Sequence, residues 1–167
     1  MKLNTGNMDK VQTKPDVLPA LRNVLFEVIE PQDRDSLQQE FKDGGMKAIR
    51  LPVRIAEPTP YTVEMPSGEL VKRDAQGRVL SVTLNYEVSE AEFLSWKGSS
   101  KASYDAKEYL RNLKRFGEAI SLDFATGDVE DSFGRFFRAD IAQRAAKGDD
   151  SGEPAFNDVK NYRANKS

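Results

Sequence analysis

The chain has 167 residues, the length of one ordinary domain, and its 25 basic and 27 acidic side chains leave a net charge of −2. It contains no cysteine and no histidine, which excludes disulfides, thiolate nucleophiles, histidine-based triads and Cys/His metal sites. We therefore expect a protein that is not an enzyme and holds no metal or cofactor, and nucleic-acid binding would need a local basic patch.

Both ends of the chain are polar. Residues 1–15 show no periodic apolar pattern, and residues 148–167 hold a few scattered apolar positions. Such segments lack the apolar surface that offsets chain entropy, so we expect two flexible arms around a single domain at 16–147. The N-terminal stretch has no long apolar run. This predicts no signal peptide and no membrane span, and a location in the cytoplasm or within a virus or phage particle.

The domain begins with a strand-rich region. We expect a strand over 23–29, where apolar residues alternate, although helical spacing competes there. A short helix over 34–43 is predicted next, because Asp33 or Asp35 can cap it and Gly44 can end it.

Another strand follows, with Ile49, Leu51, Val53 and Ile55 on one side. Pro52 cannot donate a ladder hydrogen bond, so this strand is predicted at a sheet edge or with a bend.

Hairpins are predicted between residues 60 and 88. "PYTVEM" alternates, "PSG" turns the chain, and Asp74 and Gly77 occupy favoured turn positions in "DAQG". The strand over 79–88 should bury Val82 and Leu84 and expose the alternate positions. The stretch "GELVKRDAQGRVLSVTL" resembles one hairpin unit of tyrosine-aspartate-type repeat proteins. Those units occur in long arrays and this chain has one copy, so turn chemistry accounts for the resemblance and no function follows from it.

Three helices are predicted after residue 88. The first has a Ser89–Glu92 capping box and ends at Gly98, the second covers 103–120, and the third covers 128–147. In the third, apolar residues recur every four positions: Phe133, Phe137, Ile141 and Ala145. The expected fold class is thus α+β: an antiparallel sheet of about four or five strands (residues 23–88) packed against three C-terminal helices (89–147), with flexible arms at both ends.

The most cationic stretch runs from Lys97 to Phe116, with six basic and two acidic residues. Helical spacing places Tyr109 and Phe116 on the apolar side and the cations roughly opposite. This basic face could contact phosphates, but an amphipathic helix also solvates its outer face with Lys and Arg. The candidate nucleic-acid-binding residues are Trp96, Lys97, Lys101, Tyr104, Lys107, Arg111, Lys114 and Arg115.

An acidic cluster precedes the third predicted helix. Asp123, Asp128, Glu130 and Asp131 do not have the spacing of a calcium loop. Negative charge is favourable in the first turn of a helix, so the cluster is interpreted as capping, and a paired-carboxylate hydrolase is the least favoured alternative.

These observations lead to one function and one alternative. The leading hypothesis is a non-enzymatic subunit of a multi-chain assembly, such as a virus or phage structural or assembly protein. It would act through protein–protein contacts, a homo-oligomeric or larger assembly, and extended arms. The alternative is a nucleic-acid-binding accessory protein that uses the basic helix face at 97–115.

Overall fold

A curled sheet of five long strands forms the body of the protein. The computed structural model describes residues 1–2, 17–40, 46–88, 100–146, 148 and 152–166. The five strands are β1 (Leu21–Val28), β3 (Met46–Ile55), β6 (Val79–Val88), β7 (Phe136–Ala145) and β8 (Pro154–Ala164). Their order across the sheet is β6-β3-β1-β7-β8, and each neighbouring pair is antiparallel. The end strands β6 and β8 therefore run in the same direction.

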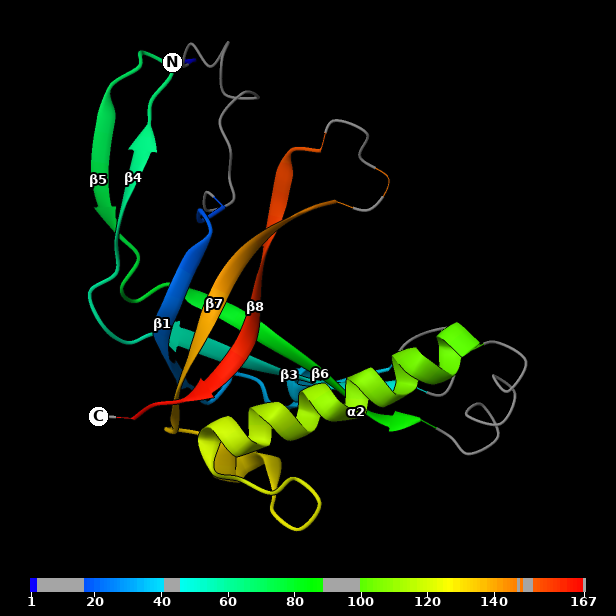
Figure 1. Cartoon of the computed structure of the whole chain (residues 1–167). Coiled ribbons are helices and arrows are strands. Elements are labelled where there is room, and N and C mark those ends of the chain that lie inside the picture. Colours follow the sequence, from blue (N-terminus) through cyan, green and yellow to red (C-terminus); the bar gives the residue numbers. More distant parts are fainter. Residues whose placement is uncertain (3–16, 41–45, 89–99, 147, 149–151, 167) are drawn as a thin grey trace.

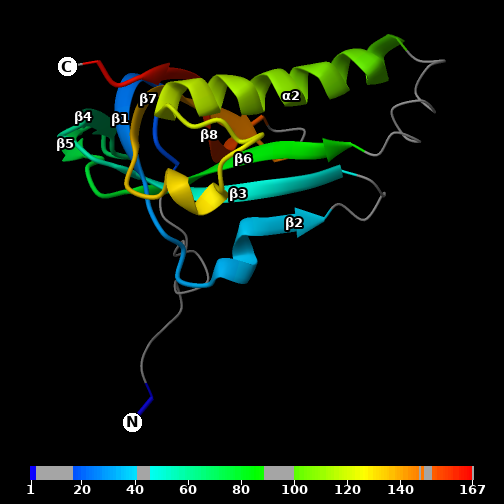
Figure 2. The same ribbon diagram turned by 90° about the horizontal axis from the view of Figure 1, so that it is seen from below.

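The sheet curls far enough for its two ends to approach each other. β6 and β8 lie in contact, although no hydrogen-bonded ladder joins them within the described residues. The helix α2 (Ser100–Ile120) packs against both of them and covers the gap (Figure 1). Figure 2 shows α2 lying along β6, with β3 on the far side of β6. The result is a nearly closed barrel with one helix across its seam.

The core fills the inside of this barrel. Strand residues alternate between the inside and the solvent, so every second side chain is buried. The alternation is regular from Val24 to Val28 on β1 and from Phe136 to Ile141 on β7, and Phe26 stacks on Phe137 with ring centroids 5.3 Å apart. The strand residues in the core cluster are Val24, Phe26, Val28, Ile49, Leu51, Val53, Ile55, Val82, Leu84, Phe137, Ala139, Ile141 and Val159.

The helix is fastened to the barrel by an aromatic cluster. Phe116 is fully buried, and its ring centroid lies 5.1 Å from those of both Phe137 and Tyr162, edge to face. Burial raises the pKa of Tyr162 to about 12, although a hydrogen bond with the Asn112 side chain opposes the rise. One residue on α2 thus contacts two neighbouring strands of the sheet.

The helix ends in a left-handed turn. Ser121 has φ 58°, and the amide N–H of Leu122 donates to the Gly117 carbonyl at 2.9 Å. This is the Schellman arrangement of a helix C-terminus. A β-carbon on Gly117 would lie 2.5 Å from the Leu122 carbonyl oxygen, so the tight return of the chain requires glycine there.

Smaller elements lie around the barrel. η2 (Arg34–Leu37) leads into β2 (Gln38–Glu40), which pairs with the first part of β3. A separate two-stranded ribbon, β4 (Pro60–Glu64) with β5 (Leu70–Asp74), connects β3 to β6 and stands apart from the barrel in Figure 1. The last, η4 (Val129–Ser132), precedes β7.

The predicted packing of a sheet against three C-terminal helices is wrong. The second predicted helix is α2, the first lies in residues 89–98 outside the described residues, and the third is replaced by η4 and β7. A spacing of four residues is also two strand periods. Phe137, Ala139 and Ile141 are all buried along β7, so the repeat came from a strand and not from a helix.

The predicted fold class also included a flexible C-terminal arm, and this part of it is wrong. Residues 154–164 form β8, which is hydrogen-bonded to β7 along its length. Pairing to a neighbouring strand stabilises a polar segment that has few apolar residues of its own. The predicted N-terminal arm falls mostly in residues 3–16, outside the described residues.

Two predictions about the first strands also need correction. The helix expected over 34–43 is a short 3-10 turn followed by β2. The strand with Pro52 is central, because β3 pairs with β6 on one side and with β1 and β2 on the other. The Pro52 carbonyl accepts a hydrogen bond from the Ile29 amide at 3.0 Å. Within a strand, the N–H and the C=O of one residue point to the same side, so the position of the N–H that Pro52 lacks also faces the space between the end of β1 and the start of β2. No ladder bond is lost there.

Other predictions are confirmed. β6 has the predicted bounds and buries Val82 and Leu84, and Ile49, Leu51, Val53 and Ile55 all face the core. The two turns that flank β5 contain Gly68 and Gly77, which both have positive φ.

Candidate nucleic-acid interface

The residues predicted from the basic stretch fall into three groups. Trp96 and Lys97 lie outside the described residues. The positions of Lys101, Tyr104 and Lys107 belong to α2, but their side chains are not among those described. Arg111, Lys114 and Arg115 are exposed on α2.

These three cations share one side of the helix. Their spacing of three and four residues brings them together, while Phe116 is buried. Arg111 pairs with Glu108 at 2.6 Å, and both side chains are partly exposed, so solvent weakens this ion pair. The structure thus forms part of the predicted stripe on the solvent side of α2.

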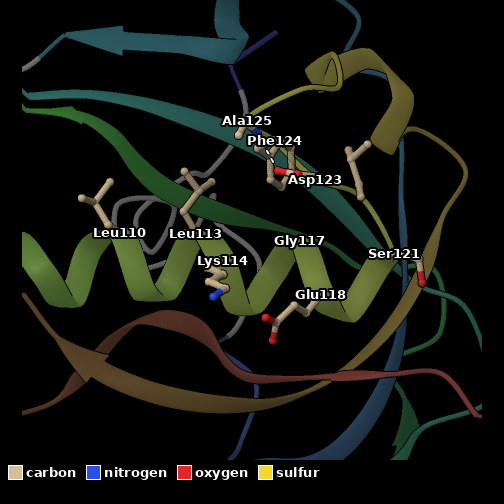
Figure 3. Close-up of a pocket in the computed structure, with 10 residues that line it drawn as sticks. Leu110, Leu113, Lys114, Gly117, Glu118, Ser121, Asp123, Phe124 and Ala125 are labelled. Carbon is tan, nitrogen blue, oxygen red and sulfur yellow. Dashed lines mark hydrogen bonds between the residues drawn. The ribbon is translucent and has the colours of Figure 1, made fainter.

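A groove runs beside this stripe. Leu110 and Leu113 project from α2 towards the side where Phe124 and Ala125 lie, as Figure 3 shows. Its volume is about 610 Å³, and Lys114 and Glu118 stand along it. Apolar side chains dominate its lining, so it offers few groups that could orient a polar ligand.

A row of arginines that was not predicted from the sequence lies on the outer face of the barrel. Arg50 and Arg54 alternate with the buried residues of β3, and Arg138 does the same on β7. β1 lies between these two strands. We call Arg50, Arg54 and Arg138 the arginine row. The same alternation that predicted the buried side of β3 could have identified Arg50 and Arg54 on its other side.

Hydrogen bonds hold each guanidinium of the arginine row in place. Arg50 donates to the Ser81 hydroxyl at 3.1 Å, and Arg54 pairs with Glu27 at 3.1 Å. Arg138 donates to Glu57 at 2.7 Å and to the Asn23 carbonyl at 3.0 Å. A guanidinium has five N–H donors, so these contacts leave donors for a further acceptor such as a phosphate oxygen.

Besides the carboxylates of Glu27 and Glu57, two exposed apolar side chains lie near the arginine row. Phe136 on β7 pairs with Glu27 in register and is 42% exposed, and Val79 on β6 pairs with Arg54 and is 51% exposed. Both side chains point to solvent from the strands that carry the arginine row or from a strand paired with them. An exposed phenyl ring beside arginines is a surface on which a nucleobase can stack.

The carboxylate of Asp140 links the strands β1, β7 and β8 next to this face. Asp140 accepts hydrogen bonds from the Asn23 amide (2.9 Å), the Asn161 side chain (2.9 Å) and the Arg163 guanidinium (2.8 Å). Desolvation would raise the pKa of Asp140, but these three donors together lower it to about 2. Asn23 and Asn161 both have positive φ and lie at register shifts of the ladders. Asp140 therefore bonds to two bulges, one at Asn23 on β1 and one at Asn161 on β8, where the sheet curls.

The acidic cluster has structural contacts. The carboxylate of Asp123 accepts the Ala125 amide at 2.9 Å, and Asp128 and Asp131 form a capping box on η4. In the described part of the chain, no group of three or more acidic side chains is placed to hold a metal ion. The predicted capping is found on the four-residue η4, whereas the long helix that it was expected to begin is replaced by η4 and β7.

Comparison of this chain with known proteins finds no match. No family model, no curated protein and no solved structure matches it. Within the described ranges, no helix is both long enough and apolar enough to cross a membrane.

Proposed function

We propose that this chain binds single-stranded nucleic acid across the arginine row on the outer face of its barrel. The observation that carries this proposal is the connectivity of the strands. The first barrel strand, β1, pairs with the second and the fourth, the third pairs with the second, and the fifth with the fourth. A helix connects the third to the fourth.

This connectivity is that of the OB-fold, a partly open five-stranded barrel that commonly binds oligonucleotides or oligosaccharides. Its ligands use the face of the second and third strands and the loops at one end. Here those strands are β3 and β6, and Arg50 and Arg54 lie on that face. Because a fold alone does not determine function, the side chains on the face are the second support for the proposal.

The chemistry of the face suits a single strand. Arginine donors can bind successive phosphates, and Phe136 can stack on an unpaired base. In a duplex the base faces are covered by their neighbours, so the aromatic contact is lost. We therefore expect binding that favours single strands over duplexes, shows little sequence preference and weakens as salt rises.

The test measures the affinity of labelled oligothymidylate by fluorescence anisotropy. The variant Arg50→Ala/Arg54→Ala should bind at least tenfold more weakly and should show a shallower dependence of log K on log salt, because each lost phosphate contact reduces the slope by about 0.7.

The matched control is Arg111→Ala/Arg115→Ala on α2, which removes the same charge from another exposed surface. It should keep the affinity of the unaltered chain. If the control loses affinity and the barrel variant does not, the helix stripe is the binding surface and the proposal is wrong. If the unaltered chain binds no single strand at low salt, the proposed function is wrong altogether.

A further inference from the structure

We infer that Phe156 and Arg144, at the β7–β8 end of the barrel, form a stacking subsite for one unpaired nucleobase. This inference rests on the proposed function and extends it to a second place on the barrel. Phe156 lies near the start of β8 and pairs in register with Arg144 near the end of β7. The subsite is therefore next to the connection between the fourth and fifth barrel strands.

One face of the Phe156 ring is already occupied. The Arg144 guanidinium carbon lies 4.9 Å from the ring centroid, which is a cation–π contact. Arg144 also donates from Nε to both carboxylate oxygens of Asp158, at 3.2 and 3.1 Å. The guanidinium is thus fixed from one side by a carboxylate and packed against the ring on another.

The ring nevertheless remains 46% exposed. One face of this phenyl ring contacts a cation, and much of the remaining surface is exposed to water. A flat apolar ligand can therefore stack on it. A nucleobase is such a ligand, and stacking of this kind tolerates any base because each has a π-face. The position supports this assignment, because the connection between the fourth and fifth strands is a ligand-binding loop in barrels of this connectivity.

The subsite also suggests a path for the bound strand. Phe136 and Phe156 both face outward, and Phe156 pairs with a residue eight positions after Phe136 on β7. Eight strand residues span about 27 Å, with Arg138 on the same outer side between the two rings and Arg144 beside Phe156. A single strand that contacts both rings would follow β7, with its phosphates near these two arginines.

The experiment compares Phe156→Leu with Phe156→Tyr on two ligands. One ligand is oligothymidylate, and the other is an abasic strand of equal length, which keeps the phosphates and lacks the bases. Phe156→Leu should bind oligothymidylate at least fivefold more weakly than the unaltered chain, since stacking contributes about 1–3 kcal/mol per base. Phe156→Tyr keeps the ring and should retain the affinity, and all three proteins should bind the abasic strand equally.

The outcomes separate the subsite from the proposed function. If the unaltered chain binds oligothymidylate and Phe156→Leu binds it equally well, the subsite is wrong while the arginine row stands. A loss by Phe156→Leu that is equal on the abasic strand also overturns the subsite, because it shows a backbone or folding effect. If no protein binds either ligand, both proposals fail.

Discussion

At the residue scale, Asp140 shows how a single carboxylate can hold a curled sheet. Its oxygens accept hydrogen bonds from β1 and β8 as well as pairing with a guanidinium. Asn23 and Asn161 adopt left-handed backbone conformations at these contacts, which asparagine tolerates better than most residues. The network therefore stabilises the folded barrel through its ionised form.

This predicts a specific dependence of stability on pH. The pKa of Asp140 is about 2 in the folded chain, against about 3.9 for an unfolded aspartate. The contribution is therefore complete above pH 4 to 5 and is lost as the pH falls towards 2. Asp140→Asn should lower the free energy of unfolding by about 1–2 kcal/mol at pH 7, after solvent screening of a partly exposed pair, and by much less at pH 2.

Urea unfolding followed by circular dichroism at several pH values measures this difference. Asp158→Asn is the control, because it also removes a carboxylate paired with an arginine, but from an exposed pair expected to contribute little. A difference between the unaltered chain and Asp140→Asn that stays constant from pH 7 to pH 2 would show that the charge of Asp140 does not stabilise the fold.

At the scale of elements, the link between α2 and the barrel depends on Phe116. Its ring contacts Phe137 and Tyr162, which come from the two strands at one end of the sheet. Truncation would leave a cavity among aromatic rings that cannot collapse onto it easily.

We expect Phe116→Ala to lower the free energy of unfolding by about 3–5 kcal/mol and the milder Phe116→Leu by about 1–2 kcal/mol. Leu110→Ala, on the same helix but 45% exposed, should change it by less than about 0.5 kcal/mol. Chemical denaturation gives all three values. Equal effects of Phe116→Leu and Leu110→Ala would contradict the packing described for α2.

The strand β6 could be predicted from the sequence, whereas β7 and β8 could not. The alternation in residues 79–88 contains five apolar positions of one parity, and no helical pattern competes, so β6 was predicted with its bounds. In β7 the large apolar residues are four apart, a spacing that fits both a helix and a strand. Ala139, which lies between them, is too small to mark the two-residue alternation of a strand. β8 has few apolar residues and depends on pairing with β7, which no local pattern reports.

The candidate site also has one part that the sequence predicted and one part that it did not. A charge count along the chain found the cations of α2, because they are close in sequence. The arginine row joins residues 50 and 54, which strand alternation places on one side of β3, with Arg138, which only the sheet order brings to the same face. Phe156 and Arg144 are likewise paired by register across a hairpin that was not predicted.

At the scale of the whole molecule, the connectivity of the barrel is the main guide to function. The net charge of −2 gives no general attraction to nucleic acid, so binding would depend on a local surface such as the arginine row. The hypothesis of a non-enzymatic assembly subunit stays a prediction, as does the location in the cytoplasm or a particle. One of its two arms is the strand β8, and the other lies outside the described residues.

Amide chemical-shift mapping with a short oligothymidylate shows whether a single strand binds across the outer face of the barrel. Binding across this face predicts the largest shifts at residues 50–54 on β3, at 136–144 on β7 and near Phe156. Shifts confined to 108–118 on α2, or no shifts at saturating oligonucleotide and low salt, would contradict it.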